Sequence, residues 1–126
     1  MISNMDENIG KLLDHIDALG ISEQTLIVFT SDNGPENGAG NPGPYKGRKR
    51  LLGEGGIRVP AIVRWKGHIK PGSSSDKFVL TTDLFPTFTH AAKIKMPTHV
   101  RIDGVSVLPM LLGDHFEFNI QVRKLN

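Results

Sequence analysis

The chain has 126 residues, of which 38% are hydrophobic and 22% are charged, and this length and composition predict one soluble globular domain. The net charge of +2 is too small to indicate nucleic acid or a membrane surface as a partner, and the absence of cysteine excludes disulfides and thiolate metal sites. The longest apolar runs are far shorter than a membrane span, and the first residues do not resemble a secretory leader, so no compartment is predicted.

An amphipathic helix is predicted over residues 5–19, where apolar side chains recur at spacings of three and four. Asn4 is its predicted N-cap, and Gly20 is its predicted stop signal. The apolar run within residues 25–30 predicts a strand that is covered on both faces. It leads into residues 34–56, a loop rich in Gly, Pro and Asn whose length favours a binding role over a plain connection.

A second strand is predicted over residues 59–63, with Pro60 near its start, where a missing backbone donor is tolerated. A second helix is predicted to begin at Thr82 or Asp83 and to bury one apolar side. The side chains expected on that side are Phe85, Phe88, Ala91 and Ala92. Residues 107–112 predict a short helical turn at the surface. Helix, strand, long loop, strand and helix in this order are typical of an α/β fold, in which ligands bind beyond the carboxyl ends of strands.

Two oxygen-bearing side chains follow the first predicted strand. Asp32 offers a carboxylate and Asn33 an amide oxygen, and both suit calcium or magnesium. Two ligands are too few for tight calcium binding, which takes about six to eight oxygens. On chemistry alone, an Asx turn that closes the strand is the favoured interpretation. A calcium loop of the EF-hand type is excluded, because the sixth position counted from Asp32 is Asn37 instead of the required glycine.

A short basic cluster lies in the predicted loop and consists of Lys46, Arg48, Lys49 and Arg50. Such a cluster also occurs in nucleic-acid-binding proteins, but no set of stacking aromatic residues accompanies it, so this interpretation is disfavoured. Glu54 and Arg58 are predicted to form a buried pair that fixes the loop, and Gly55 and Gly56 are predicted to permit its backbone conformation. The five histidines show no spacing typical of metal ligands.

Several segments in a fixed order resemble a known family, the formylglycine-dependent sulfatases. They begin with the helix start at Met5–Gly10 and the strand end Ser31-Asp32-Asn33-Gly34, which is followed by Lys49 and the run Glu54-Gly55-Gly56-Ile57-Arg58-Val59-Pro60. Thr82-Asp83-Leu84-Phe85-Pro86-Thr87 and Asp103-Gly104-Val105-Ser106 complete the match. The resemblance assigns residues 1–113 to the C-terminal part of a sulfatase catalytic domain and leaves 114–126 as a divergent tail. It implies a partial alkaline-phosphatase-like α/β sandwich, with a mixed sheet and flanking helices.

The resemblance also implies roles for individual residues. Asp32 and Asn33 correspond to ligands of Ca²⁺ in the family, which reverses the preference for a plain turn. Lys49 corresponds to the lysine that contacts the substrate sulfate, where an ammonium acts as a compact point charge. Lys46 is a competing assignment for that lysine, and an isolated lysine is most often a solvated surface residue. Gly53 departs from the family, which usually has an aromatic residue at this position.

The family's nucleophile is a formylglycine made from cysteine or serine, and no such motif occurs in this sequence. The Ser73-Ser74-Ser75 run lacks the proline and arginine that follow the nucleophile in the family. The prediction is therefore a truncated sulfatase-like chain, a sulfuric ester hydrolase by family, that carries part of the metal and sulfate site and is inactive alone. Whether the chain by itself is an enzyme stays open.

Two alternatives remain. One is a non-catalytic module that binds an anion or a protein on a sulfatase scaffold, and the other is a fragment of a related phosphatase or phosphodiesterase. The expected small-molecule partner is a sulfate ester or another anion. Because half of a larger sheet leaves an edge without a neighbour, we also expect a homo-oligomer or a complementary chain.

Overall fold

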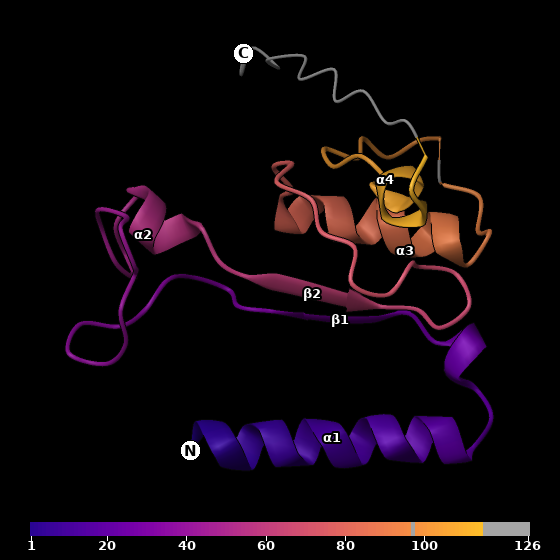
Figure 1. Ribbon diagram of the computed structural model, residues 1–126. Helices are drawn as coiled ribbons and strands as arrows, with labels where there is room; N and C mark the ends of the chain where they lie inside the picture. Colours follow the sequence, from indigo (N-terminus) through magenta and orange to yellow (C-terminus); the bar gives the residue numbers. More distant parts are fainter. Residues whose placement is uncertain (97, 115–126) are drawn as a thin grey trace. The chain divides into compact units, whose positions relative to one another are not determined.

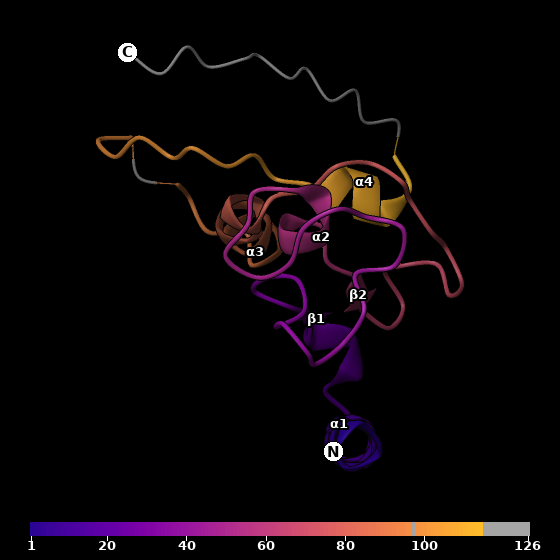
Figure 2. The same cartoon turned by 90° about the vertical axis from the view of Figure 1, so that its left-hand side faces the viewer.

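The computed structural model describes residues 1–96 and 98–114 and divides the chain into two compact units. The first unit spans Met1–Gly67, and the second begins at His68. The predicted tail at 114–126 lies, apart from Asp114, outside the described residues. Figures 1 and 2 show the helices and strands of each unit from two directions. No helix of the described part is both long and apolar enough to cross a membrane.

The helix α1 spans Ile2–Ala18, so the predicted helix is confirmed. It begins earlier than predicted, with Met1 as N-cap, and the prediction that Asn4 caps it is wrong. Asn4 lies inside the first turn, where its side-chain oxygen accepts a hydrogen bond from Asn8 Nδ2 at 3.0 Å. A polar pair one turn apart is compatible with a helix interior, so the cap pattern alone did not locate the end. Gly20, with φ of +70°, follows the helix as predicted.

The apolar side of α1 is only partly covered. Ile9, Leu13 and Ile16 are half-buried, whereas Leu12 and Leu19 are 55% and 58% exposed. No residue of the helix is fully buried. The first unit therefore leaves part of an apolar helix surface in solvent, although the sequence pattern is that of a helix that packs against a core.

Two short strands make the sheet of the first unit. The strand β1 (Ile27–Thr30) pairs antiparallel with β2 (Ala61–Arg64), so that Val28 lies opposite Val63 and Phe29 opposite Ile62. Both predicted strands are confirmed at slightly shifted bounds. Figures 1 and 2 show α1 running alongside this strand pair.

The prediction that the first strand is covered on both faces is wrong for this chain. Phe29 is 40% exposed and its partner Ile62 is 64% exposed. The reason is that the described residues cover the faces of this two-stranded pair only in part, so no residue of either strand is fully buried. This pair is the part of the expected mixed sheet that the described residues contain.

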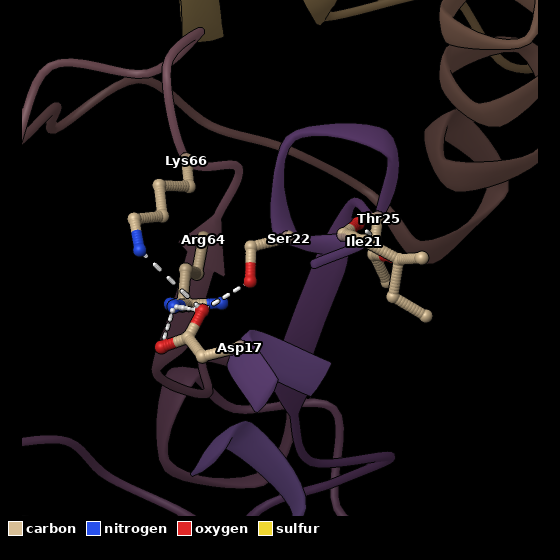
Figure 3. A network of polar contacts seen from close by, with 6 residues as sticks. All are labelled: Asp17, Ile21, Ser22, Thr25, Arg64 and Lys66. Atoms are coloured by element: carbon tan, nitrogen blue, oxygen red, sulfur yellow. Dashed lines mark hydrogen bonds and ion pairs between the residues drawn. The ribbon is translucent and has the colours of Figure 1, made fainter. Parts of the chain in front are cut away.

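A polar network joins the end of α1 to β2 (Figure 3). The Asp17 carboxylate accepts hydrogen bonds from Arg64 Nη2 at 2.8 and 3.0 Å and one from Ser22 Oγ, and Lys66 Nζ lies 3.6 Å away. The Ser22 hydrogen bond and then the Arg64 guanidinium lower the pKa of Asp17 from 3.8 to about 2. Nearby, Trp65 Nε1 donates to the Glu23 carbonyl at 2.7 Å. These contacts position α1 where apolar packing is sparse.

The second unit contains a 3₁₀ turn at Thr81–Asp83, α3 (Leu84–Ala91) and α4 (Leu108–Leu112), which confirms both predicted helices. Its centre is polar. The buried Asp83 carboxylate accepts from the Leu80 and Val105 amides, each at 2.9 Å. The buried Thr87 hydroxyl donates to the Asp83 carbonyl at 2.6 Å and accepts from the Val107 amide at 2.9 Å.

The prediction for the buried side of α3 is wrong. Phe85 and Phe88 are 52% and 42% exposed, Ala92 is exposed and Ala91 is half-buried, whereas the helix buries Pro86 and Thr87. The hydrogen bonds of Thr87 determine which side of α3 faces inward, so the apolar side chains Phe85 and Phe88 lie on the outer side. The helical turn predicted at 107–112 is also more buried than predicted, because Leu108 at its start is buried.

Candidate functional site

The candidate metal ligands lie just beyond the end of β1. Asp32 is exposed, and its carboxylate makes no hydrogen bond or ion pair with another residue in the described part of the chain. Asn33 is half-buried, and its Nδ2 donates to the Gly34 carbonyl at 2.9 Å. The Asn33 side-chain oxygen accepts nothing from the described residues. Neither oxygen is used in an Asx turn, so both are available to a ligand.

A junction of four close-packed glycines, Gly34, Gly53, Gly55 and Gly56, joins this strand end to the predicted loop. The Gly34 amide donates to the Gly56 carbonyl at 2.8 Å. A Cβ on Gly34 would overlap the Gly55 carbonyl, and a Cβ on Gly56 would overlap the Leu51 carbonyl. These positions need glycine for close backbone approach, since no side chain fits between the segments. The junction therefore fixes the loop against the end of β1.

Lys49 is held on the same side of the loop. Its amide donates to the Pro35 carbonyl at 3.1 Å, two residues beyond Asn33. Its ammonium lies 3.7 Å from Glu36 Oε2, and the lysine side chain is 39% exposed. An ion pair that is this long and this exposed contributes little, so the ammonium remains able to bind an anion.

The structure also distinguishes Lys46 from Lys49. The Lys46 carbonyl accepts from the Gly55 amide at 2.9 Å, which ties this residue to the glycine junction instead of to the strand end. Of the two lysines, Lys49 is the one bonded next to the Asp32–Asn33 segment. This placement agrees with the assignment of Lys49 as the anion-binding lysine, although the assignment itself stays a prediction.

The sequence did not predict two features of this region, a short helix and an aromatic contact. The helix α2 (Glu54–Ile57) lies beyond the end of β1 (Figure 1). It was not predicted because two of its four residues are glycines, which are buried here. Glu54 and Arg58 pair at 3.3 Å across one helical turn, as predicted, but they are exposed, so the prediction of a buried pair is wrong. The helix is too short to bury its outer side. Arg58 also lies 4.5 Å above the ring of Tyr45, which no sequence pattern indicated.

Two open pockets flank Tyr45. One, of about 560 Å³, is lined among others by Asn33, Pro35, Pro42, Tyr45 and Arg58. The other, of about 610 Å³, is lined among others by Pro42, Tyr45, Lys46, Arg48 and Leu52. Pro42 and Tyr45 border both, so the two pockets are neighbours in the first unit. The residues that line the larger pocket all come from the long predicted loop, and the other pocket is completed by Ser31, Asn33 and residues 58–60.

Clusters of metal-binding side chains were sought among all the described residues. Among residues 1–96 and 98–114, no group of three or more His, Asp or Glu side chains is placed to hold a metal ion. Of the histidines, His90 contacts the Ser106 hydroxyl at 2.9 Å through Nδ1.

Comparison with known proteins confirms the resemblance seen in the sequence. The Sulfatase family model matches residues 1–94. Steryl-sulfatase from Rattus norvegicus is 39% identical over 121 residues, covering 89% of this chain and 21% of the relative. N-acetylgalactosamine-6-sulfatase from the same organism is 40% identical over 120 residues, covering 90% of this chain and 23% of the relative.

Solved structures show the same relationship. The crystal structure of Ps i-CgsB aligns with a TM-score of 0.82 at 35% identity, over 90% of this chain and 25% of that one. PsFucS1 sulfatase from Pseudoalteromonas sp. aligns with a TM-score of 0.79 at 33% identity, over 88% of this chain and 23% of that one. The fold is thus part of the alkaline-phosphatase-like α/β class. The chain belongs to the sulfatase family of hydrolases, and it spans about a fifth of the length of the curated relatives it matches.

Proposed function

We propose that this chain supplies part of the metal and sulfate site of a sulfuric ester hydrolase. The observation that carries the proposal is the pair of backbone hydrogen bonds from Gly34 to Gly56 and from Lys49 to Pro35, at 2.8 and 3.1 Å. They hold a lysine beside a strand end that carries two free oxygen donors. A sulfate ester needs both a cation and positively polarised groups around its oxygens.

The donor chemistry at Asp32 and Asn33 fits a calcium ion but does not complete its coordination. One carboxylate and one amide oxygen are hard donors of the kind calcium prefers, and about six to eight are needed. The remaining ligands would come from other parts of a sulfatase domain. A calcium ion bound there would offset the negative charge of the sulfate. Asp32 contributes the negative charge of the pair. Asn33 contributes a side-chain oxygen in a fixed orientation, because its Nδ2 donates to the Gly34 carbonyl.

Lys49 is proposed to bind a sulfate oxygen. Its ammonium carries three donors and pairs only weakly with Glu36, so it can turn toward an anion without breaking a strong interaction. Its backbone is fixed by the Pro35 bond, so the charge stays near the strand end. In a complete site it would stabilise charge that grows on the sulfate as the ester bond breaks.

The chain by itself is proposed to be inactive. It contains no cysteine, and Ser73-Ser74-Ser75 lacks the surrounding residues of a formylglycine motif. Without an activated nucleophile, a bound sulfate ester is not attacked. A phosphatase relative would favour phosphate esters, so calorimetric binding of the sulfate and the phosphate monoester of one phenol separates it from the main proposal. A non-catalytic anion-binding module shares the inactivity of the chain, and it is separated by the chimera described below, which would then show no turnover.

Calorimetric titration of the purified chain tests the metal donors. We expect weak calcium binding that is lost in Asp32→Asn and retained in Asp14→Asn, which removes the same charge from an exposed position on α1. Calcium binding that is unchanged in Asp32→Asn would refute the assignment. Tight binding or turnover of an aryl sulfate by the chain alone would refute the proposed inactivity.

A chimera tests Lys49 in a complete site. Residues 1–113 replace the matching segment of human arylsulfatase A, which is 38% identical over 116 residues. We expect aryl sulfate turnover by the chimera, and a loss of about 10²–10³-fold in kcat/KM on Lys49→Gln, as for removal of one charge-stabilising donor. Lys46→Gln is the matched control. An equal loss in both variants, or a loss in the control alone, would refute the assignment.

We also propose that the open strand pair associates with a second copy or a complementary chain. Each of the two strands has one edge without a neighbouring strand among the described residues, and Phe29 and Ile62 expose apolar side chains on a face of the pair. Open strand edges and exposed apolar surface both favour association. Light scattering over a wide concentration range is the test. A mass that stays at 13.8 kDa throughout would refute self-association, and only a complementary chain would remain.

A further inference from the structure

The dipeptide Asn-Gly occurs twice after β1, at Asn33-Gly34 and at Asn37-Gly38. In this dipeptide the backbone nitrogen of the glycine can attack the side-chain amide of the asparagine, because glycine has no Cβ to hinder the approach. The two copies lie four residues apart in the same chain. Differences in their reactivity therefore depend on the surroundings that the fold gives to each.

The nitrogen that would attack Asn33 is already bonded. The Gly34 amide donates to the Gly56 carbonyl at 2.8 Å, and Gly34 is buried. Asn33 Nδ2 donates to the Gly34 carbonyl at 2.9 Å, so the side chain is held as well. Ring closure would break both hydrogen bonds inside the glycine junction, where even a Cβ on Gly34 would overlap the Gly55 carbonyl. The fold therefore protects Asn33.

The second copy lies in an open turn. Asn37 and Gly38 are exposed, and the Ala39 amide donates to the Glu36 carbonyl across them at 3.2 Å. Nothing lies within 4 Å of a Cβ built on Gly38. Neither the Gly38 amide nor the Asn37 side chain makes a hydrogen bond with another residue of the described part of the chain. The nucleophile and the group that it attacks are both free.

We propose that Asn37 is a site of spontaneous deamidation, with water as the co-reactant. The Gly38 nitrogen loses its proton and forms a bond to Asn37 Cγ, the Cγ–Nδ2 bond breaks, and Nδ2 leaves with that proton as ammonia. Water then opens the succinimide ring, adding its hydroxyl to one of the two ring carbonyl carbons and a hydrogen to the nitrogen. The product is aspartate or isoaspartate at this position, and no group is oxidised or reduced. At neutral pH the new carboxyl group is ionised, so the chain gains one negative charge.

The new charge arises beside a carboxylate that already faces Lys49. The Asn37 amide donates to Glu36 Oε1 at 3.3 Å, and Glu36 Oε2 lies 3.7 Å from the Lys49 ammonium. A second carboxylate on the neighbouring residue attracts the same ammonium and repels an anion that approaches it. Deamidation therefore weakens anion binding at Lys49. This consequence rests on the proposed function, whereas the deamidation itself does not.

Peptide mapping by mass spectrometry measures both asparagines in one sample of the intact chain, incubated in neutral buffer at physiological temperature. We expect Asn37 to deamidate at least ten-fold faster than Asn33, and an isoaspartate methyltransferase to label position 37. In guanidinium chloride, which releases the Gly34 amide, the two rates should agree within three-fold. Equal rates in the folded chain would overturn the modification site. A ten-fold difference that persists in the unfolded chain would overturn the role of the fold.

Two variants of the intact chain test the effect on Lys49. Asn37→Asp carries the charge of the product, and Asn37→Ser is the neutral control. We expect the dissociation constant of 4-nitrophenyl sulfate, measured by NMR titration, to rise at least two-fold in Asn37→Asp but not in Asn37→Ser. The difference should shrink at higher salt, because exposed charges are screened. Equal affinities of the two variants would overturn the effect on Lys49. Unchanged binding in Lys49→Gln would instead refute the proposed function, and the mass spectrometric result does not depend on it.

Discussion

Substitution of Gly34 tests whether the glycine junction holds the site together. The Gly34 amide donates to the Gly56 carbonyl at 2.8 Å, and a Cβ on Gly34 would overlap the Gly55 carbonyl. The backbone at Gly34 is not in the left-handed region, so Gly34→Ala creates no torsional strain. Its effect is purely a collision between two backbone segments, which cannot be relieved by moving a flexible side chain.

The magnitude follows from two terms. Separating the segments lengthens or breaks one buried backbone hydrogen bond, which contributes about 0.5–1.5 kcal/mol. Forcing a methyl group into close-packed backbone adds about 1–3 kcal/mol. We therefore expect the free energy of unfolding of the first unit to fall by about 1.5–4.5 kcal/mol, a large part of the stability of a small domain. Calcium binding at Asp32 should weaken as well, because the strand end and the loop separate.

Urea unfolding followed by Trp65 fluorescence measures this change, since Trp65 is the single tryptophan and lies in the first unit. Gly10→Ala is the control. Nothing lies within 4 Å of a Cβ there, and an alanine in place of a glycine inside α1 should stabilise the helix by about 0.8–1.0 kcal/mol. A Gly34→Ala protein that unfolds at the wild-type urea concentration would refute the role of the junction.

Three further variants test the polar networks. Asp17 has a pKa of about 2, below its ordinary 3.8, so its stabilising contribution is complete above pH 3.8 and is lost as pH falls through 2. Asp17→Asn should therefore lose less stability than wild type between pH 4 and pH 2; identical acid unfolding curves would contradict this. Asp83→Asn replaces one of two accepting oxygens and should destabilise the second unit by about 1–3 kcal/mol, seen as faster exchange of the Val105 amide. Thr87→Val leaves the Val107 amide unpaired and should cost a similar amount, with exchange at Val107 as the measurement and unchanged exchange as the contrary result.

Local signals predicted the elements of this chain well. The spacing of Ile9, Leu13 and Ile16 correctly predicted the first helix, and the apolar run before Thr30 correctly predicted the first strand. The order Asp32, Asn33 and Lys49 followed from the family motif, and the structure brings the backbone of Lys49 beside the strand end. These features depend on sequence neighbours or on motif spacing, so they could be recognised without coordinates.

Burial could not be predicted in the same way. Phe88 belongs to an apolar face by periodicity, yet Thr87 is the buried residue because it bonds to both Asp83 and Val107. Which side of a helix turns inward depends on partners far along the chain. The contact of Arg58 with Tyr45 is of the same kind, because it joins the middle of a loop that has no periodic pattern to a residue just beyond the end of that loop.

The loop at 34–56 can accept extra residues in one part of its length. Hydrogen bonds hold its backbone at Pro35 and again from Lys46 onward. A Cβ at Gly38, between these positions, meets no atom within 4 Å. Exposed, loosely contacted loop tips are where chains accept inserted residues. Extra residues near Gly38 would therefore reshape the approach to the pockets while Asn33 and Lys49 keep their places. The same segment is a suitable position for a tag or a spectroscopic label.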